Sequence, residues 1–479
     1  MRPIRVDDAS SLTTYAGFQA RYRDDPAGFA LDCVNWRPGE HPAPYQLEVL
    51  THLASRRRAS VRGPHGLGKT ALASLAILWF ALTRDGEDWK IPTTASAWRQ
   101  LTKFLWPEIH KWSNRLRWDR IGRGALDRRA ELLTLSMKLA TGEAFALASN
   151  QAALIEGAHA DHLLYLFDEA KTIPPDTWDA AEGAMSSGST YWLAISTPGE
   201  PVGRFYDIHR RRPGYDDWWV RHVTRNEAVA AGRIDEKWAE KRRQQWGENS
   251  AVYQNRVEGQ FASGDEDGVI PLSWVEAANE RWHAISEAGD WGPLLTVGVD
   301  VARYGSDRTV LALRHEAGVK ALRRHSKEDT MQTAGRVAGV LEAQGGRAVV
   351  DVIGVGAGVV DRLREMGRAV DAFNSSERTD KRDVSGELGF ADKRAAAYWQ
   401  LRELLDPAGP APIALPPDDL LTGDLTAPHW RVQSGGRIRV ESKDDIKERL
   451  GRSPDDGDAV VMAFWRDAAQ PTGGVGFVL

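Results

Sequence analysis

The segment GPHGLGKT, residues 63–70, has the residue types and spacing of a loop that binds nucleotide phosphates. Its glycines let backbone N–H groups close around phosphate oxygens. Lys69 would bring a positive charge to the β and γ phosphates, and Thr70 would offer a hydroxyl to Mg²⁺. The predicted nucleotide-binding residues of the loop are Gly63, Gly66, Gly68, Lys69 and Thr70. The chemistry they predict is hydrolysis of ATP with Mg²⁺.

The sequence on both sides of the loop fits this interpretation. Residues 59–62 predict a short strand, and the apolar residues 71–82 predict a buried helix whose N-terminus would face the phosphates. Ahead of them, Gln46 lies at the predicted start of a short helix, where its amide could contact the adenine edge. A chance match to the loop pattern is the alternative, and the strand–loop–helix order argues against it.

Two acidic residues follow the apolar run LLYLF, residues 163–167. The run predicts a buried parallel strand, and α/β sheets bind their ligands at the carboxyl ends of such strands. Asp168 would therefore hold Mg²⁺, and Glu169 would orient or deprotonate the attacking water. Taken alone, the pair could also be plain helix-capping residues. Together with the phosphate loop, it predicts an ATPase.

A further apolar strand, residues 191–195, leads into Ser196 and Thr197. Hydroxyl residues at this place could sense the γ phosphate and couple hydrolysis to movement. A buried strand followed by a turn at Pro198 explains the same pattern.

The C-terminal part of the sequence carries acidic residues that could form a second site. Asp300 lies at the end of the predicted strand 294–300, and Asp307 follows in a turn. Asp351 ends a second short apolar strand, residues 347–351. Each of the two predicted strands thus carries one carboxylate at or near its end.

A third acidic segment, SPDDGDA, leads into an apolar helix. Ser453 could cap that helix, Pro454 suits its first position, and Asp456 lies where it would complete a capping box. Asp455 and Asp458 remain, and their spacing of three places them on one helical face.

Carboxylates from two strands and a helix are what a two-metal nuclease needs. Hard oxygen ligands can hold two Mg²⁺ or Mn²⁺ ions about 3.5–4 Å apart, one activating water and the other stabilising the leaving oxygen. Such crowded acids do not all stay ionised without cations. Strand-end turns and a helix cap would place acids at the same positions, so the spacing alone leaves both interpretations open.

Length and composition predict two or three domains of a soluble protein. The chain has 479 residues, of which 42% are hydrophobic and 27% charged. Its longest apolar run is too short to cross a bilayer. The N-terminus lacks the apolar core of a signal peptide, and the single cysteine, Cys33, can form no internal disulfide. We therefore expect a cytoplasmic protein that is neither secreted nor membrane-bound.

The net charge of −5 does not by itself indicate a nucleic-acid binder, but the basic residues are clustered. The clusters are residues 56–58, 210–212, 241–243 and 381–382. Each could be part of a DNA-binding stripe or a solvated surface.

The order of the predicted elements indicates an α/β chain. Apolar strands alternate with helices from about residue 62 to 198, which predicts a parallel-rich sheet covered by helices. The predicted parts are an N-terminal extension, 1–58; an ATPase core, 59–198; a linker subdomain, 199–291; a second domain, 292–468; and a loose tail, 469–479.

Taken in order, these motifs resemble the large terminase subunit of tailed double-stranded DNA bacteriophages, which cuts concatemeric phage DNA and pumps it into a procapsid. The resemblance covers most of the chain. The segments that carry it are 45–46, 63–70, 93–100, 155–159, 163–170, 196–198, 298–307 and 453–459. It implies an N-terminal P-loop NTPase of the additional-strand type, a linker subdomain and a C-terminal nuclease domain with an RNase H-like fold.

The resemblance also implies roles for single residues. Glu169 would be the catalytic carboxylate of the ATPase, and Ser196 and Thr197 would lie in its coupling motif. The implied metal-binding acids of the nuclease are Asp300, Asp351 and Asp458, with Asp455 and Asp307 as weaker candidates. The sequence leaves open which of Asp307, Asp455 and Asp456 joins the metal site.

The phosphate loop departs from the family at one position. Many members carry an arginine inside the loop, but this chain has His65 there, and histidine is mostly neutral at cytoplasmic pH. An arginine finger from a neighbouring subunit could supply the missing charge, and such fingers are worth about 10³–10⁵ in rate in other NTPases. Arg99, Arg128 and Arg129 are candidates that the sequence does not rank.

The expected function is that of a DNA-packaging motor subunit with ATP-driven translocation and metal-dependent cutting. The resemblance implies double-stranded DNA, a small terminase subunit and the portal ring of the procapsid as partners. It also implies a homo-oligomer, expected to be a pentamer, that docks transiently on the procapsid in the host cytoplasm. The alternatives are a helicase or repair ATPase fused to a nuclease, and a packaging ATPase whose C-terminal domain is a non-catalytic scaffold. The sequence does not distinguish headful from site-specific cutting.

Overall fold

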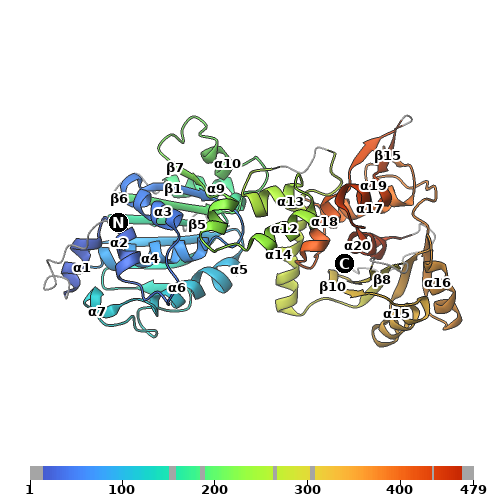
Figure 1. The fold of residues 1–479 in the computed structure, drawn as a ribbon, viewed down its shortest axis with the longest axis horizontal. Helices are drawn as coiled ribbons and strands as arrows, with labels where there is room; N and C mark the ends of the chain where they lie inside the picture. Colours follow the sequence, from blue (N-terminus) through green and yellow to red (C-terminus); the bar gives the residue numbers. More distant parts are fainter. Residues whose placement is uncertain are drawn as a thin grey trace, which may run out of the picture. The chain divides into compact units, whose positions relative to one another are not determined.

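The computed structural model describes residues 14–149, 158–183, 189–262, 267–302, 308–433 and 436–466. The chain divides into two compact units, each built around its own sheet (Figure 1). The first unit comprises Met1–Glu240 and Gln254–Ala262, and the second comprises Lys241–Tyr253 and Ser263–Leu479. Asp307, residues 155–157 and the tail 469–479 lie outside the described residues. The linker subdomain over 199–291 stays a prediction, and its residues are divided between the two units.

Among the described residues of the first unit, seven strands form one sheet in the order β3-β4-β2-β5-β6-β1-β7. Neighbouring strands are parallel except for β3 and β4. The strands are β1 (Arg58–Arg62), β2 (Trp89–Ala95), β3 (Ser136–Lys138), β4 (Gly142–Ala148), β5 (His162–Asp168), β6 (Ser189–Ser196) and β7 (Trp219–His222). Strand β6 lies between β1, which leads into the phosphate loop, and β5, which ends in the acid pair. This order confirms the additional-strand P-loop fold.

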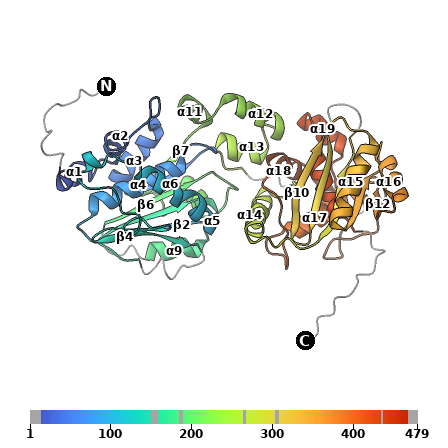
Figure 2. The same ribbon diagram turned by 90° about the horizontal axis from the view of Figure 1, so that it is seen from below.

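Helices cover both faces of this sheet. The helix after the phosphate loop, α4 (Lys69–Arg84), packs on one face, and α9 (Pro175–Gly183) packs on the other (Figure 2). Because α4 is apolar on all sides, nearly all of its residues are buried. The other helices and turns are α1 (Tyr15–Tyr22), α2 (Pro26–Asp32), α3 (Pro44–Arg56), α5 (Trp98–Gln100), η1 (Leu101–Leu105), α6 (Trp106–Ser113), α7 (Trp118–Ile121), η2 (Ala170–Thr172), α10 (Arg204–His209), α11 (Arg225–Ala230) and η3 (Gln254–Glu258).

The sheet of the second unit has the order β10-β9-β8-β11-β12 among its described residues. Strand β9 is antiparallel to both of its neighbours, β8 and β10, whereas β8, β11 and β12 run parallel to one another. The strands are β8 (Leu294–Asp300), β9 (Thr309–His315), β10 (Gly318–His325), β11 (Arg347–Asp351) and β12 (Val370–Phe373). This mixed order confirms the RNase H-like fold, and it brings the carboxyl ends of β8 and β11 side by side.

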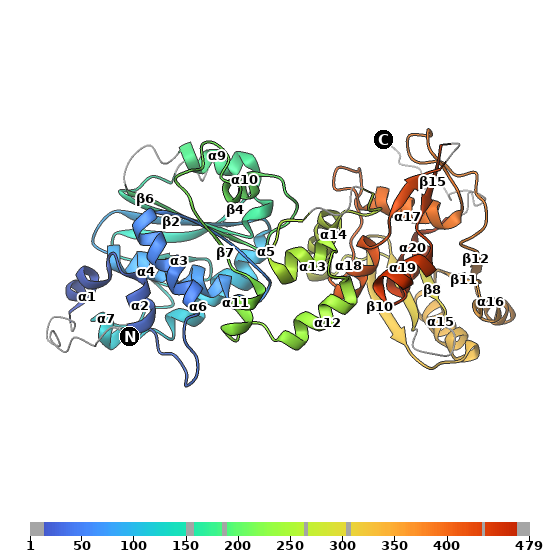
Figure 3. The same cartoon turned by 45° about the horizontal axis from the view of Figure 1, so that its top comes forward.

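Two layers of helices cover this second sheet (Figure 3). Helices α15 and α16 pack on one face, and α17 and α20 pack on the other. A small sheet of β13 (Gly389–Phe390), β15 (Arg437–Val440) and β14 (Trp430–Val432) lies in the same unit. Its helices are α13 (Ala251–Tyr253), α14 (Leu272–Ala288), α15 (Thr330–Gln344), α16 (Gly356–Glu365), α17 (Lys393–Leu405), α18 (Asp419–Thr426), α19 (Lys443–Leu450) and α20 (Asp455–Phe464). Helix α12 (Glu236–Trp246) begins in the first unit and ends in the second.

No helix within the described ranges is long and apolar enough to span a membrane.

Candidate functional site

The phosphate loop, the acid pair and the coupling motif meet at the carboxyl end of the first sheet. Gly66 and Gly68 have φ angles of 83° and 75°, which only glycine adopts without strain. Lys69 Nζ donates hydrogen bonds to Pro64 O at 2.9 Å and to Thr197 Oγ1 at 3.1 Å. The lysine that would bind phosphate is therefore in direct contact with the residue predicted to sense it.

The acid pair contacts the same motif. Asp168 is 4% exposed, and burial and the neighbouring charge of Glu169 raise its pKa to about 7 although Lys69 lowers it. Glu169 has a left-handed backbone, with φ of 48°, and its Oε2 accepts a hydrogen bond from Ser196 Oγ at 3.0 Å. Strained backbones of this kind gather at functional sites. Ser196 and Thr197 thus connect strand β6 to both groups that would act on the nucleotide.

The raised pKa of Asp168 leads to a pH prediction. Below its pKa the carboxyl is protonated, which would remove the predicted Mg²⁺ ligand, so the Mg²⁺ requirement should rise as the pH falls through 7. At pH 6, half-maximal ATP turnover should need about ten times more Mg²⁺ than at pH 8, as expected for one competing proton. Phosphate release measured across Mg²⁺ titrations at the two pH values checks this. Equal midpoints would show that Asp168 is ionised at both.

Gln46 is buried against the phosphate loop. Its Oε1 accepts from the backbone N–H of Ala43 at 2.9 Å, and its Nε2 donates to Gly68 O at 3.0 Å. With 2% of its surface exposed, Gln46 supports the loop in this structure. A contact with adenine stays a prediction, and it would require the side chain to release one of these bonds.

Cations surround the loop position where the family carries an arginine. His65 keeps an exposed edge, but desolvation and the charges of Arg256, Lys69 and Lys171 hold its pKa well below the ordinary value. The ring is therefore neutral and supplies no charge, while Arg256 and Lys171 do so from nearby. Sequence reasoning did not identify Arg256 or Lys171.

Arg256 reaches the loop because residues 254–262 return to the first unit. The backbone N–H of His65 donates to Arg256 O at 3.0 Å. Gly259 has a φ of 65°, and a Cβ at this position would lie 2.7 Å from the Cα of Gly63. Of the three arginines named from the sequence, Arg99 stacks over Phe104 and the other two are exposed. Their role as a finger remains a prediction.

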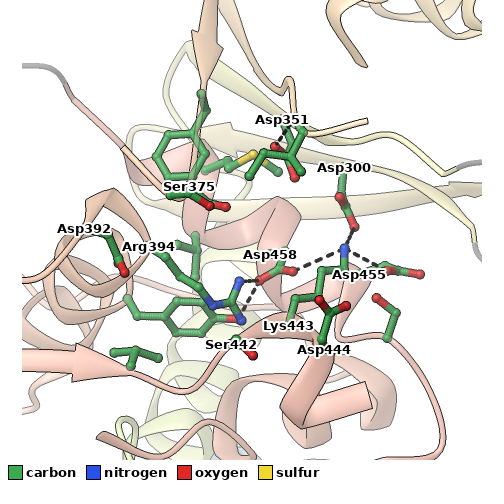
Figure 4. A pocket seen from close by; sticks show the side chains of 18 of the residues that line it. Asp300, Asp351, Ser375, Asp392, Arg394, Ser442, Lys443, Asp444, Asp455 and Asp458 are labelled. Atoms are coloured by element: carbon green, nitrogen blue, oxygen red, sulfur yellow. Dashed lines mark hydrogen bonds and ion pairs between the residues drawn. The ribbon is translucent and has the colours of Figure 1, made fainter. Parts of the chain in front are cut away.

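The predicted nuclease acids line one pocket of about 520 Å³ in the second unit (Figure 4). Strand β8 delivers Asp300 and the parallel strand β11 delivers Asp351, while Asp455 and Asp458 come from the first turn of α20. The structure therefore brings together four of the five carboxylates that the sequence identified.

A lysine that sequence reasoning missed lies among these acids. Lys443 Nζ is 2.8 Å from Asp300 Oδ2, 3.2 Å from Asp455 Oδ1 and 3.3 Å from Asp458 Oδ2. Asp351 lies on the other side of the pocket, where its Oδ1 accepts from the backbone N–H of Ile353 at 2.9 Å (Figure 4). Lys443 is the first residue of α19, 143 positions after Asp300 in the sequence, and no local pattern marks it.

The charges of this cluster act on each other. Burial, followed by the nearby charges of Asp455 and Asp458, raises the pKa of Asp300 well above its ordinary value despite the ammonium of Lys443. Burial alone would raise the pKa of Asp458, but Arg394 and Lys443 hold it below its usual range. Asp458 Oδ1 accepts hydrogen bonds from Arg394 Nη1 and Tyr398 Oη, both at 2.8 Å. The surroundings of Asp458 thus favour its ionised form, whereas those of Asp300 favour its protonated form.

The donor set of the pocket suits Mg²⁺ or Mn²⁺, which prefer carboxylate oxygens. Within the described ranges, no group of three or more His, Cys, Asp or Glu side chains stands ready to hold a metal ion. The ammonium of Lys443 instead lies between three of the carboxylates. Divalent cations would therefore have to compete with this lysine.

This competition makes a second prediction. Replacing Lys443 by glutamine should tighten Mn²⁺ binding by about tenfold or more, a change of about 1.4 kcal/mol, because a competing positive charge is removed. Electron paramagnetic resonance of free Mn²⁺ measures the affinity. Lys320→Gln, at an exposed position on β10, is the matched control. Unchanged or weaker binding in Lys443→Gln would contradict competition.

The start of helix α20 differs from the prediction. Its first residue is Asp455, and Pro454 occupies the capping position without a side-chain hydrogen bond, so the capping box of Ser453 and Asp456 is wrong. Asp424 of α18 caps the helix instead, since its Oδ2 accepts from the backbone N–H groups of Asp456 and Gly457. The Asp456 carboxylate pairs with Arg324, which excludes it from the pocket. The placement of Asp455 and Asp458 on one face is confirmed.

No family model matches the chain. A probable terminase large subunit of Enterobacteria phage P7 is 26% identical over 328 residues, which make up 65% of this chain and 64% of that protein. This similarity confirms the resemblance to large terminase subunits. The chain matches somewhat less than two thirds of the length of this curated relative.

Two solved structures are also similar. One is the nuclease domain of the large terminase subunit gp2 of bacterial virus Sf6, with 23% identity over 42% of this chain and 99% of that chain, at a TM-score of 0.36. The other is the large terminase from a thermophilic bacteriophage, with 14% identity over 88% of this chain and 98% of that chain, at a TM-score of 0.41.

Proposed function

We propose that this chain is a viral DNA-packaging motor subunit that hydrolyses ATP to move double-stranded DNA into a procapsid. In the same proposal, the second unit cuts concatemeric DNA with a two-metal endonuclease site. The observation that carries the proposal is the presence of two separate sites in one chain. One is a phosphate loop with its acid pair, and the other is a pocket of four carboxylates on an RNase H-like sheet. The similarity to the phage P7 protein supports it.

In the ATPase site, Lys69 would bind the β and γ phosphates, and Thr70 and Asp168 would hold Mg²⁺. Glu169 would orient the attacking water. Its hydrogen bond to Ser196, and that of Lys69 to Thr197, would change as the γ phosphate leaves, which gives strand β6 a direct signal of hydrolysis. Arg256 and Lys171 would stabilise charge that the neutral His65 cannot.

In the nuclease site, Asp300, Asp351, Asp455 and Asp458 would hold the metal ions. Two divalent cations bound there would supply an activated water and stabilise the leaving oxygen. Arg394 and Tyr398 fix the Asp458 carboxylate, and Lys443 neutralises the acids in the absence of cations.

The proposed partners are double-stranded DNA, a small terminase subunit and the portal ring of a procapsid, on which the chain would act as a homo-oligomer in the host cytoplasm. A motor must accept any sequence, so its DNA contacts should be mostly to phosphates and its DNA affinity should fall steeply with salt.

Displacement of a third strand tests the motor directly. The Asp300→Asn variant, which should not cut, would be given ATP and a linear duplex that carries a triplex-forming oligonucleotide. Because translocation along intact duplex strips off the third strand, release of the oligonucleotide without separation of the duplex is the expected result. Separation of the duplex strands would identify a helicase, and ATP turnover without any release would remove the motor assignment.

A further inference from the structure

A buried carboxylate supports the helix that carries two of the nuclease acids. Asp424 is 1% exposed, and its Oδ2 accepts hydrogen bonds from the backbone N–H groups of Asp456 at 3.0 Å and Gly457 at 3.2 Å. Helix α20 has no side-chain cap of its own. Because Asp455 and Asp458 lie in the same first turn, this cap from α18 also sets their positions.

Arg452 connects this cap to the end of helix α12. Its Nη1 pairs with Asp424 Oδ1, and its Nε donates to the backbone oxygen of Gln245 at 3.0 Å. The next residue, Trp246, is 2% exposed and donates its Nε1–H to Asp419 O at 2.8 Å. The last residues of α12 are thus bonded to both the cap and the helix that carries it.

Helix α18 packs closely against both the end of α12 and the start of α20. A Cβ at Gly423 of α18 would lie 2.7 Å from Trp246 Cδ1 and 3.2 Å from Arg452 Nη2. A Cβ at Gly457 of α20 would lie 2.9 Å from Asp424 Cβ. Contacts this close occur only because both positions are glycine. A shift of Trp246 therefore moves α18, and a shift of Asp424 moves the start of α20.

We propose that Asp424 and Arg452 are positioning residues of the nuclease site, and that the end of α12 holds them in place. Helix α12 begins in the ATPase unit and ends on this support. When the end of α12 keeps its contacts with Arg452 and α18, Asp424 caps α20, and Asp455 and Asp458 are aligned to hold metal ions. When it is displaced, the cap loosens and the site loses its metal affinity. The inference rests on the proposed nuclease function.

Mn²⁺ binding by the full chain, measured by electron paramagnetic resonance, is the test. Asp424→Ala should weaken Mn²⁺ binding by about 10–100-fold, the usual effect of removing an outer-shell partner. Asp424→Asn should recover most of the affinity, because asparagine caps helices about as well as aspartate. Gly423→Ala should weaken binding in the same direction by forcing Trp246 and Arg452 away. Gly335→Ala on α15, where an added Cβ meets no atom within 4 Å, is the matched control.

Two further readouts separate positioning from loss of folding. All folded variants should keep wild-type ATP turnover. In Asp424→Ala and Gly423→Ala, the Mn²⁺ concentration that gives half-maximal cutting should rise, while the cutting rate at saturating Mn²⁺ should approach that of the wild type. If Asp424→Ala does not fold, Gly423→Ala decides the question. An Asp424→Ala protein that binds Mn²⁺ as tightly as the wild type would overturn this inference without affecting the proposed nuclease function. If Asp424→Ala does not fold, the same result in folded Gly423→Ala would overturn it. A wild-type protein that neither binds Mn²⁺ nor cuts DNA removes the proposed nuclease itself.

Discussion

Asp300→Asn is expected to lower the rate of plasmid cutting in Mn²⁺ by about 10³-fold or more, equivalent to about 4 kcal/mol of transition-state stabilisation. The substitution keeps the size of the side chain but removes a carboxylate that ends β8 and lines the pocket. It also removes an ion pair of Lys443, which stays paired with Asp455 and Asp458. ATP turnover should stay at the wild-type rate, because the ATPase residues lie in the other unit.

The control for this variant is Asp361→Asn, an exposed position on α16 in the same unit. It should cut DNA as the wild type does. Conversion of supercoiled plasmid to linear and open-circular forms, followed over time, gives both rates. If Asp300→Asn cuts as fast as the control, Asp300 is not part of a nuclease and the carboxylate pocket needs another explanation.

Glu169→Gln is expected to lower ATP turnover by about 10²–10⁴-fold, the usual contribution of a positioned general base. Glutamine keeps an oxygen that can accept the hydrogen bond from Ser196, so the site should stay folded and still bind ATP. Plasmid cutting in Mn²⁺ without ATP should be unchanged.

Phosphate release and the binding of a fluorescent ATP analogue distinguish chemistry from affinity in this variant. Glu236→Gln, at an exposed position in the first turn of α12, is the control. A Glu169→Gln protein that hydrolyses ATP at the control rate would show that another residue activates the water.

The parts of the chain that sequence alone predicted are those with local signatures. The phosphate loop is recognisable because glycine, lysine and threonine must stand at fixed spacing, and helix α4 follows it from Lys69 to Arg84. Strands β5, β8 and β11 are short apolar runs that end in an acid, so both their extent and the position of Asp168, Asp300 and Asp351 at the carboxyl ends of these strands could be predicted.

The parts that could not be predicted depend on contacts between distant segments. Lys443 meets Asp300 from 143 positions away, and Arg256 reaches the phosphate loop only because its segment returns to the first unit. Capping rules consider neighbours in sequence and therefore predict Ser453 as the cap of α20. In the structure the cap is Asp424, which lies 32 positions before Asp456. Asp424 also pairs with Arg452, which bonds to the end of α12.

Measuring ATP turnover and plasmid cutting on the same preparations tests most directly whether one chain holds two separable active sites. Wild-type protein, Asp300→Asn and Glu169→Gln would be compared with Mg²⁺ and with Mn²⁺. The predicted result is that the wild type shows both activities, Asp300→Asn loses only cutting and Glu169→Gln loses only ATP turnover. A wild-type protein that cuts with neither metal, or substitutions that abolish both activities together in folded protein, would contradict the claim.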